Sequence, residues 1–396
     1  MSSIYLDWAA SGLPMDEVLS ECTQVAKAYF ANPSSVHAPG KAAHHRLETA
    51  RAGCASIIGC RPQELFFTSG GSEANNIIFA SLLHKKRKGS VVISAVEHAS
   101  VYEPAIHLKE FGFEVRLVKP RSNGVLDPID VKACIDQSTQ CVSVIHVNNE
   151  TGSIQPVSAI AKAVRDVETS TGKKILFHCD AVQSFGKLPV NVIELDVDAL
   201  SASGHKLGGP KGSGLLFLNR EMQVLYRGGG QESGIRPGTE NLPAVWGLYR
   251  SASIWDKTQN DVKNQAQKLA AILKGGIDLI ENGRLVPATR DAELSTHSPF
   301  IVAATFPPIP GEVLVRAMTD RGFFISTGSA CSSRGAKKNR VLGNIGISKD
   351  VADSAIRISI GPTTKEGDCR SFCDALRREV STLRNAILGS GSAISH

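Results

Sequence analysis

Short apolar runs alternate with helix-like patterns along residues 64–219. In one helix-like stretch, Ala74, Ile77 and Ile78 fall on a single helical face, and residues 157–164 show the same spacing. Repeated strand and helix units of this kind predict an α/β domain built around a mostly parallel sheet. The predicted strands of this domain are residues 64–68, 91–95, 114–118, 141–147, 175–179, 199–202 and 214–218.

The pattern changes after the glycine-rich stretch 228–238. Helices follow first, then a predicted strand near 301–306, a helix near 311–320, a strand near 356–360 and a final amphipathic helix. A chain of 396 residues is long enough for two domains. We therefore predict a large α/β domain of residues 15–260. A smaller α+β domain would contain residues 261–396 together with residues 1–14.

Composition places the chain among ordinary globular proteins, with 42% apolar and 21% charged residues. The net charge of +6 is spread along the sequence, and its one dense run, residues 84–88, suits a helix end, so we expect no direct contact with nucleic acid. Nine scattered cysteines predict reduced thiols rather than disulfides. Without a signal-like N-terminus or an 18-residue apolar run, the chain is expected to be cytoplasmic and not membrane-spanning.

Candidate chemistry lies just after predicted strands, because open α/β sheets bind ligands at the carboxyl ends of their strands. The first such segment, Thr68-Ser-Gly-Gly-Ser-Glu-Ala, has a glycine turn whose N–H groups could hold a phosphate. Ser72 could add a hydroxyl, or could simply cap the helix. In the second segment, His98 could stack on an aromatic ring or move a proton, although a lone histidine is more often structural.

The third and fourth segments carry an acid and a lysine. Asp180 ends an apolar strand, where a carboxylate needs a cation such as a protonated pyridine nitrogen, and Gln183 could reach the same ligand. A capping role for Asp180 stays open. Lys206 lies between a strand and a glycine-rich loop, where it could form a Schiff base while Ser203 and His205 donate to a phosphate. Taken alone, Lys206 could also be solvated.

These four segments in this order resemble the cysteine desulfurase family, which has an aspartate-aminotransferase-like fold and uses pyridoxal phosphate. Tyr5-Leu-Asp-Trp-Ala-Ala and Asn32-Pro-Ser-Ser-Val-His extend the resemblance over essentially the whole chain. The resemblance implies that Lys206 holds the cofactor, that Asp180 contacts its pyridinium and that Gln183 contacts its ring hydroxyl. It also implies that His98 stacks on the ring and is a candidate acid or base.

The remaining contacts that the resemblance implies involve phosphate and substrate. Phosphate contacts would come from Gly71, Ser72, Ser203 and His205. Thr239, in Arg-Pro-Gly-Thr-Glu-Asn, would reach the phosphate of the other subunit in a homodimer. Asn149 and Arg357 would bind the carboxylate of L-cysteine, since a planar bidentate donor suits that group. A structural ion pair is the alternative for Arg357.

Cys331 determines which reaction the family resemblance implies. It lies in a loop of small polar residues with a basic continuation, 334–340, and cationic neighbours favour the thiolate form. The resemblance implies that Cys331 takes sulfur from L-cysteine as a persulfide and leaves alanine. The alternatives are a selenocysteine lyase, a related aminotransferase, or a non-enzymatic docking subunit. The presence of Lys206, Asp180 and Cys331 together argues against the docking subunit.

The sulfur acceptor is left open by the sequence. It could be an iron–sulfur scaffold, a tRNA-thiolation protein or a sulfur carrier, because residues 389–396 differ from the docking extension that many family members carry. The basic run 334–340 hints at an acidic partner surface, or is merely solvated. His and Cys spacings do not match a zinc site, so we expect no metal.

Overall fold

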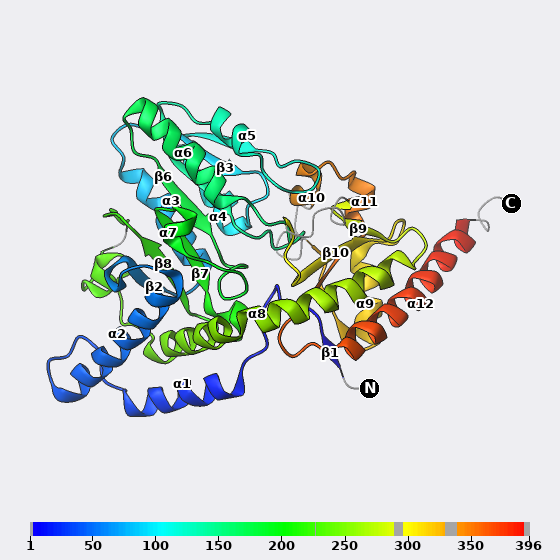
Figure 1. Cartoon of the computed structure of the whole chain (residues 1–396), viewed down its shortest axis with the longest axis horizontal. Helices are drawn as coiled ribbons and strands as arrows, with labels where there is room; N and C mark the ends of the chain where they lie inside the picture. Colours follow the sequence, from blue (N-terminus) through cyan, green and yellow to red (C-terminus); the bar gives the residue numbers. More distant parts are fainter. Residues whose placement is uncertain (1–2, 226, 289–295, 329–338, 392–396) are drawn as a thin grey trace.

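The computed structural model describes residues 3–225, 227–288, 296–328 and 339–391. Its centre is a seven-stranded sheet in which every strand except β8 runs in the same direction (Figure 1). In spatial order the strands are β2 (Leu65–Thr68), β8 (Gly214–Leu218), β7 (Ala199–Ser203), β6 (Leu176–Asp180), β5 (Thr139–Ile145), β3 (Ser90–Ser94) and β4 (Glu114–Val118).

The predicted strands of the large sheet are confirmed, with ends within two residues of those observed. Strands 114–118 and 214–218 match at both ends. The inner strands β5, β6 and β7 are almost entirely buried, as expected for strands covered on both faces. Their sequences, Thr-Gln-Cys-Val-Ser-Val-Ile, Leu-Phe-His-Cys-Asp and Ala-Leu-Ser-Ala-Ser, contain more apolar than polar residues and do not alternate strictly along their whole length.

Helices cover both faces of this sheet and enclose two apolar clusters. The helices that follow strands are α3 (Gly71–Ser81), α4 (Ala99–His107), α5 (Pro128–Ala133), α6 (Val157–Thr171) and α7 (Val192–Leu195). Short 3₁₀ turns are η1 (Pro62–Glu64), η2 (Leu82–His84), η3 (Leu108–Phe111), η4 (Gly204–Leu207) and η5 (Gln231–Gly234). Near the N-terminus, α1 (Asp16–Ala28) and α2 (Ala38–Ile58) pack against the long helix α8 (Leu242–Asp278).

The C-terminal part is a second layer of sheet and helices. Its antiparallel sheet has the order β12 (Ala355–Ser359), β10 (Ile301–Thr305), β9 (Arg284–Val286). Its helices are α9 (Gly311–Asp320), α10 (Arg340–Asn344), α11 (Lys349–Asp353) and α12 (Glu366–Gly391). The strands predicted near 301–306 and 356–360 and the helix near 311–320 are confirmed, whereas the short strand β9 escaped prediction.

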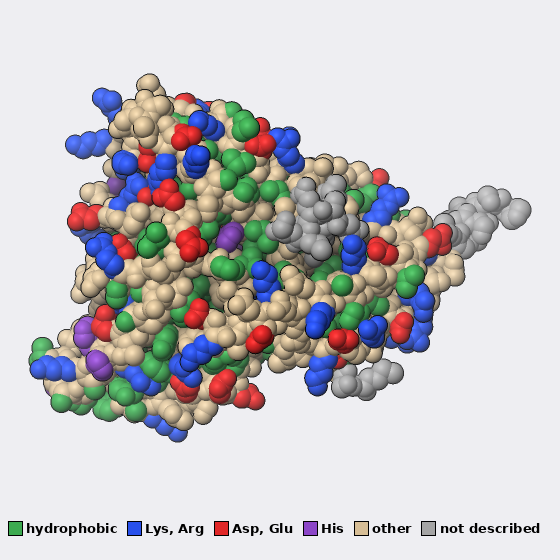
Figure 2. Space-filling view, viewed as in Figure 1, with side chains coloured by type: hydrophobic (Ala, Val, Ile, Leu, Met, Phe, Trp, Pro, Cys, Tyr) green, Lys and Arg blue, Asp and Glu red, His purple; other side chains and the backbone are tan. Residues whose placement is uncertain are grey.

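The N-terminus returns to this C-terminal part, where β1 (Ile4–Tyr5) pairs in parallel with β11 (Phe323–Phe324). The boundary predicted between residues 260 and 261 falls inside the continuous helix α8, and the division into two domains stays a prediction. Figure 2 shows basic side chains interspersed with acidic ones on the face in view. Among the helices of the described ranges, none is long and apolar enough to cross a membrane.

Trp255 on α8 ties the C-terminal part to the turn that carries Lys206. Its ring is 1% exposed and packs edge-on against Phe300, with ring centroids 5.8 Å apart. Its indole nitrogen Nε1 donates a hydrogen bond of 3.0 Å to the carbonyl of Leu207, the last residue of η4. A buried indole with its N–H satisfied contributes both apolar packing and a directional anchor.

Trp255→Ala should lower the free energy of unfolding by about 3–5 kcal/mol, because it leaves a large cavity and an unsatisfied carbonyl. Urea unfolding followed by far-ultraviolet circular dichroism measures this loss. Leu279→Ala, at an exposed position just past α8, is the control and should change stability by about 0.5 kcal/mol or less. Equal effects of the two substitutions would contradict the anchoring role of Trp255.

Candidate active site

The segments singled out in the sequence converge at one edge of the large sheet. Strands β2, β3, β5, β6 and β7 all end at this edge, so the residues that follow them are brought together. The pKa of His98 shows this proximity. It is lowered mainly by burial, raised by the Asp180 carboxylate, and lowered again by Lys206, Arg340 and Arg357. His98 is therefore neutral near pH 7, a form that can accept a proton.

Asp180 is a buried carboxylate at the last position of β6, with 2% of its surface exposed. Its Oδ2 accepts a hydrogen bond from Asn75 Nδ2 (2.9 Å), and its Oδ1 accepts one from the backbone N–H of Val182 (3.0 Å). Asn75 lies on α3, is fully buried and was missed in the sequence. These donors orient the carboxylate.

Lys206 lies in η4 and points at the N-terminal segment. Its Nζ donates to the carbonyl of Ala9 (2.6 Å) and to that of Ala10 (2.7 Å). Gln183 Nε2 donates to the same Ala9 carbonyl at 2.8 Å. The backbone N–H of Gly12 donates to the His205 carbonyl (2.8 Å), so residues 9–12 form one wall of the site.

The residues predicted to bind phosphate surround the start of α3. Gly71 begins this helix, and Gly70 before it has φ of 155°, a conformation that L side chains rarely adopt. A Cβ on Gly70 would lie 3.8 Å from the Ser203 hydroxyl, so Ser203 faces the helix N-terminus, while Ser72 is exposed in its first turn. Burial, followed by the cations Lys206, Lys211 and Lys187, lowers the pKa of His205 to about 4. Helix N–H groups, a hydroxyl and a neutral imidazole suit an anion.

Arg357, on β12, is 4% exposed and holds two partners. Its Nη2 forms an ion pair with Asp7 (2.8 Å), and its Nη1 donates to the backbone carbonyl of Asn149 (2.9 Å). Its Nε is buried without a hydrogen-bond partner. The structural ion pair considered as the alternative role of Arg357 therefore exists. The guanidinium still has N–H groups that could bind a further carboxylate.

Glu150 is a second buried acid near Arg357. Burial raises its pKa to about 7, and Arg357 and Arg340 lower it only partly. Its Oε2 lies 3.5 Å from where a Cβ on Gly328 would be, beside the start of the loop that contains Cys331. The sequence did not single out Glu150.

Cys331 itself lies outside the described residues, as do residues 334–338 of the basic run. Arg340 is described, and it does not point to solvent. Its guanidinium donates to the carbonyls of Ala95 and Glu97 and lies 4.0 Å from the ring centroid of Tyr102. The solvated interpretation of the basic run is therefore wrong for Arg340. Buried cysteines elsewhere are poor nucleophiles, since burial raises the pKa of Cys141 to about 12.

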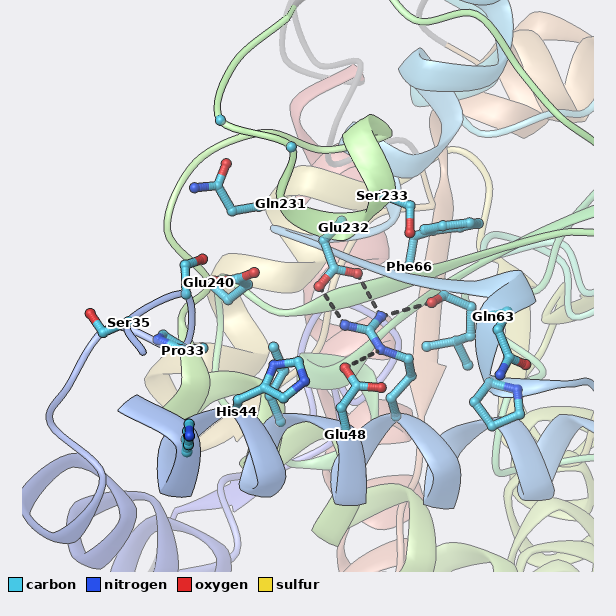
Figure 3. Close-up of a pocket in the computed structure, with 18 of the residues that line it drawn as sticks. Pro33, Ser35, His44, Glu48, Gln63, Phe66, Gln231, Glu232, Ser233 and Glu240 are labelled. Atoms are coloured by element: carbon cyan, nitrogen blue, oxygen red, sulfur yellow. Dashed lines mark hydrogen bonds and ion pairs between the residues drawn. The ribbon is translucent and has the colours of Figure 1, made fainter. Parts of the chain in front are cut away.

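Thr239 is exposed, just after the glycine-rich stretch 228–238. The loop is anchored beside a cavity of about 650 Å³ between α2 and η5. There the Glu232 carboxylate receives two bonds of 2.7 Å from Arg51, and Glu48 approaches the same guanidinium at 2.9 Å (Figure 3). Glu232 also accepts the backbone N–H of Phe67 (2.7 Å), which fixes the loop to β2.

The chain matches the family model "Aminotransferase class-V" over residues 4–372. It is 34% identical to "Cysteine desulfurase IscS" of Dictyoglomus turgidum, a match that covers 96% of this chain and 95% of that protein. The chain belongs to the cysteine desulfurase family. Another member, "Cysteine desulfurase, mitochondrial" of Candida albicans, is 35% identical over 96% of this chain and 77% of that protein.

Solved structures of the family have the same fold. One described as a NifS-like protein superposes with a TM-score of 0.88 at 31% identity, covering 96% of this chain and 100% of that one. A structure of "SspA in complex with cysteine" has a TM-score of 0.79 at 30% identity and covers 91% of this chain and 99% of that one. The aspartate-aminotransferase-like α/β fold expected from the sequence is confirmed.

The family depends on pyridoxal phosphate, and the side chains at the sheet edge fit that cofactor. The edge offers an amine on Lys206 for a Schiff base and a buried acid on Asp180 for a protonated pyridine nitrogen. It also offers donors for a phosphate at the start of α3. Within the described residues, no group of three or more His, Cys, Asp or Glu side chains could hold a metal ion.

Arg51→Met should lower the free energy of unfolding by about 3–5 kcal/mol, because it leaves the Glu232 carboxylate buried without its cation. Thermal or urea unfolding tests this. The double variant Arg51→Met/Glu232→Gln should lose less than Arg51→Met alone, since no unpaired charge remains. Arg61→Met, in an exposed pair with Glu64, should leave unfolding nearly unchanged. A double variant less stable than Arg51→Met would refute this account.

Proposed function

We propose that this protein is a pyridoxal-phosphate-dependent cysteine desulfurase that converts L-cysteine to L-alanine and keeps the sulfur as a persulfide on Cys331. The observation that carries the proposal is that the N-terminal segment, which receives Lys206 at Ala9 and pairs with Arg357 through Asp7, lies at the sheet edge where Asp180 ends β6. An amine, a buried acid and a carboxylate clamp are the three groups that amino-acid chemistry with this cofactor requires.

Each cofactor contact rests on a separate residue of this chain. Lys206 would hold the cofactor covalently, and Asp180, oriented by Asn75, would keep the pyridine nitrogen protonated. Gln183 would contact the ring hydroxyl, and His98 would stack on the ring. Gly71, Ser72, Ser203 and His205 would bind the phosphate. When bound, the cofactor supplies an electron sink that makes the Cα proton of an amino acid removable.

The substrate would be held by its carboxylate between Arg357 and Asn149. In the structure Asn149 uses its backbone carbonyl to fix Arg357, which leaves its side-chain amide for the substrate. Lys206, once released from the cofactor, would take the Cα proton. His98 is the candidate acid or base, because an imidazole at this position could accept a proton and return it.

Sulfur transfer would take place at Cys331. Its thiolate attacks the sulfur of the substrate, so that a sulfur–sulfur bond forms while the carbon–sulfur bond of the substrate breaks. The electron pair of the broken bond stays with the substrate carbon Cβ, which must take up a proton before alanine leaves, and Cys331 carries the persulfide. Cationic neighbours in the sequence favour the thiolate that this attack requires.

Beyond the reaction, we place the protein in the cytoplasm as a homodimer, with Thr239 of one subunit reaching the phosphate site of the other. Thr239 is exposed on an anchored loop, which suits such a contact. The large domain of residues 15–260 would bind the cofactor, and the small domain would carry the Cys331 loop. Acceptors of the sulfur would be an iron–sulfur scaffold or a tRNA-thiolation protein.

Protein purified with pyridoxal phosphate should absorb visible light, and Lys206→Ala should lose both this band and alanine formation. The reason is that Lys206 supplies the Schiff-base nitrogen. Lys211→Ala, an exposed lysine in the same loop, is the matched control and should keep the band. A band that persists in Lys206→Ala after removal of unbound cofactor would contradict the assignment.

Cys331→Ser should reduce persulfide formation by roughly 100-fold or more, because the covalent nucleophile is lost. Mass spectrometry of the protein and quantification of alanine measure both products. Cys134→Ser, a half-buried cysteine outside the site, should behave as the unchanged protein does.

The products also separate the alternative functions. Turnover of selenocysteine alone indicates a lyase, keto-acid formation indicates an aminotransferase, and no turnover of either amino acid indicates a docking subunit.

A further inference from the structure

Lys187 is a buried lysine that the proposed reaction does not use. It lies in the turn after β6, and 3% of its surface is exposed. Burying an ammonium group is unfavourable unless an anion or strong acceptor compensates it. Within the described ranges, no carboxylate forms an ion pair with Lys187, and the charged groups that act on it, Lys206 and Arg357, are both cations. Simple structural pairing therefore does not account for this residue.

The hydrogen bonds of Lys187 lead directly to Lys206. Its Nζ donates to Gln183 Oε1 at 3.3 Å. The other end of that amide, Gln183 Nε2, donates to the carbonyl of Ala9 at 2.8 Å, and Lys206 Nζ donates to the same carbonyl at 2.6 Å. A chain of three contacts therefore joins the two lysines through one side-chain amide and one backbone carbonyl.

The ammonium group of Lys187 determines which way the Gln183 amide points. An ammonium has three donors and no acceptor, so the amide atom that faces it must be the oxygen. The NH₂ of Gln183 is then directed away from Lys187, toward the Ala9 carbonyl and Lys206. The Ala9 carbonyl selects the same orientation, because an acceptor must face the NH₂, so without Lys187 the amide is fixed at one end only.

We propose that Lys187 is a positioning residue, which fixes the Gln183 amide with its NH₂ toward the site and adds a second buried positive charge beside Lys206. This inference rests on the proposed function, because it assigns Lys187 a role toward the cofactor that Lys206 would hold.

The charges around Lys187 support the second half of the proposal. Burial, and then Lys206 and Arg357, lower the pKa of Lys187 to about 7, and Lys187 in turn helps to lower the pKa of His205. Like charges disfavour each other's charged form. In its charged form, which predominates below about pH 7, Lys187 therefore favours loss of the proton from the nitrogen of Lys206, whether that nitrogen is a free amine or is bound to the cofactor.

Both effects of Lys187 lower the pKa of the Lys206 nitrogen. Its charge disfavours the protonated nitrogen directly. The NH₂ that it directs toward the site would stabilise a negatively charged ring hydroxyl and so weaken the attraction of that oxygen for the protonated nitrogen. Removing Lys187 should therefore raise the pKa at which the visible absorbance of the loaded protein changes.

The test is a pH titration of the visible band in the holoenzyme and in Lys187→Met, which keeps the apolar stem but removes the charge and the donors. The pKa of the band should rise by about one unit or more in Lys187→Met. Lys187→Arg, which retains charge and donors, should stay closer to the unchanged protein. Lys174→Met, at an exposed lysine on the same subunit, is the control and should show no shift.

Each outcome of the titration supports or overturns the role of Lys187. An unchanged band pKa in Lys187→Met would overturn the role of Lys187 while leaving the proposed function intact. Absence of the band from the unmodified protein would instead refute the proposed function, and this inference with it. Thermal unfolding accompanies the titration, because a methionine at this buried position should fold at least as stably as the lysine, so a shift with intact folding supports positioning.

Discussion

The site depends on a carboxylate buried at the end of β6. Asp180 would be unstable as an anion in an apolar interior without donors, and Asn75 and the Val182 N–H provide two. Its charge affects the groups around it. Burial, and then Asp180, raise the pKa of the neighbouring Glu97 well above its usual value. The same carboxylate raises the pKa of His98, against the larger lowering caused by burial.

The N-terminal segment holds the cations of the site. Asp7 pairs with Arg357, the carbonyls of Ala9 and Ala10 receive Lys206, and the N–H of Ala9 donates to the Ser359 hydroxyl (2.9 Å). This segment therefore contacts both the large sheet edge and β12.

Side-chain contacts outside the sheet edge hold the elements that carry the site residues in position. Trp255 on α8 ties η4 to the C-terminal part, and the Arg51–Glu232 pair ties the glycine-rich loop to β2. Arg340 joins α10 to the strand ending before His98 through the carbonyls of Ala95 and Glu97. Each anchor uses a side-chain donor on a backbone carbonyl or a buried carboxylate. Such contacts are directional, so they fix orientation as well as distance.

The sequence by itself determined the strands of the large sheet and the polar residues that end them. Buried strands are rich in apolar residues, and an acid such as Asp180 or a lysine such as Lys206 at or just after the end of such a strand is conspicuous. Resemblance to a family then gave these residues their expected roles. The homodimer contact of Thr239 and the persulfide on Cys331 stay predictions of this kind.

Only the tertiary structure decided which other groups complete the site. Asn75, Asp7 and Lys187 read as ordinary helix, loop and turn residues, and the carbonyls of Ala9 and Ala10 have no side-chain signature at all. Their partners are distant in sequence, as with Asp7 and Arg357. Hydrogen bonds between such residues depend on how the N-terminal segment packs across the sheet edge, and local patterns of polarity carry no information about that packing.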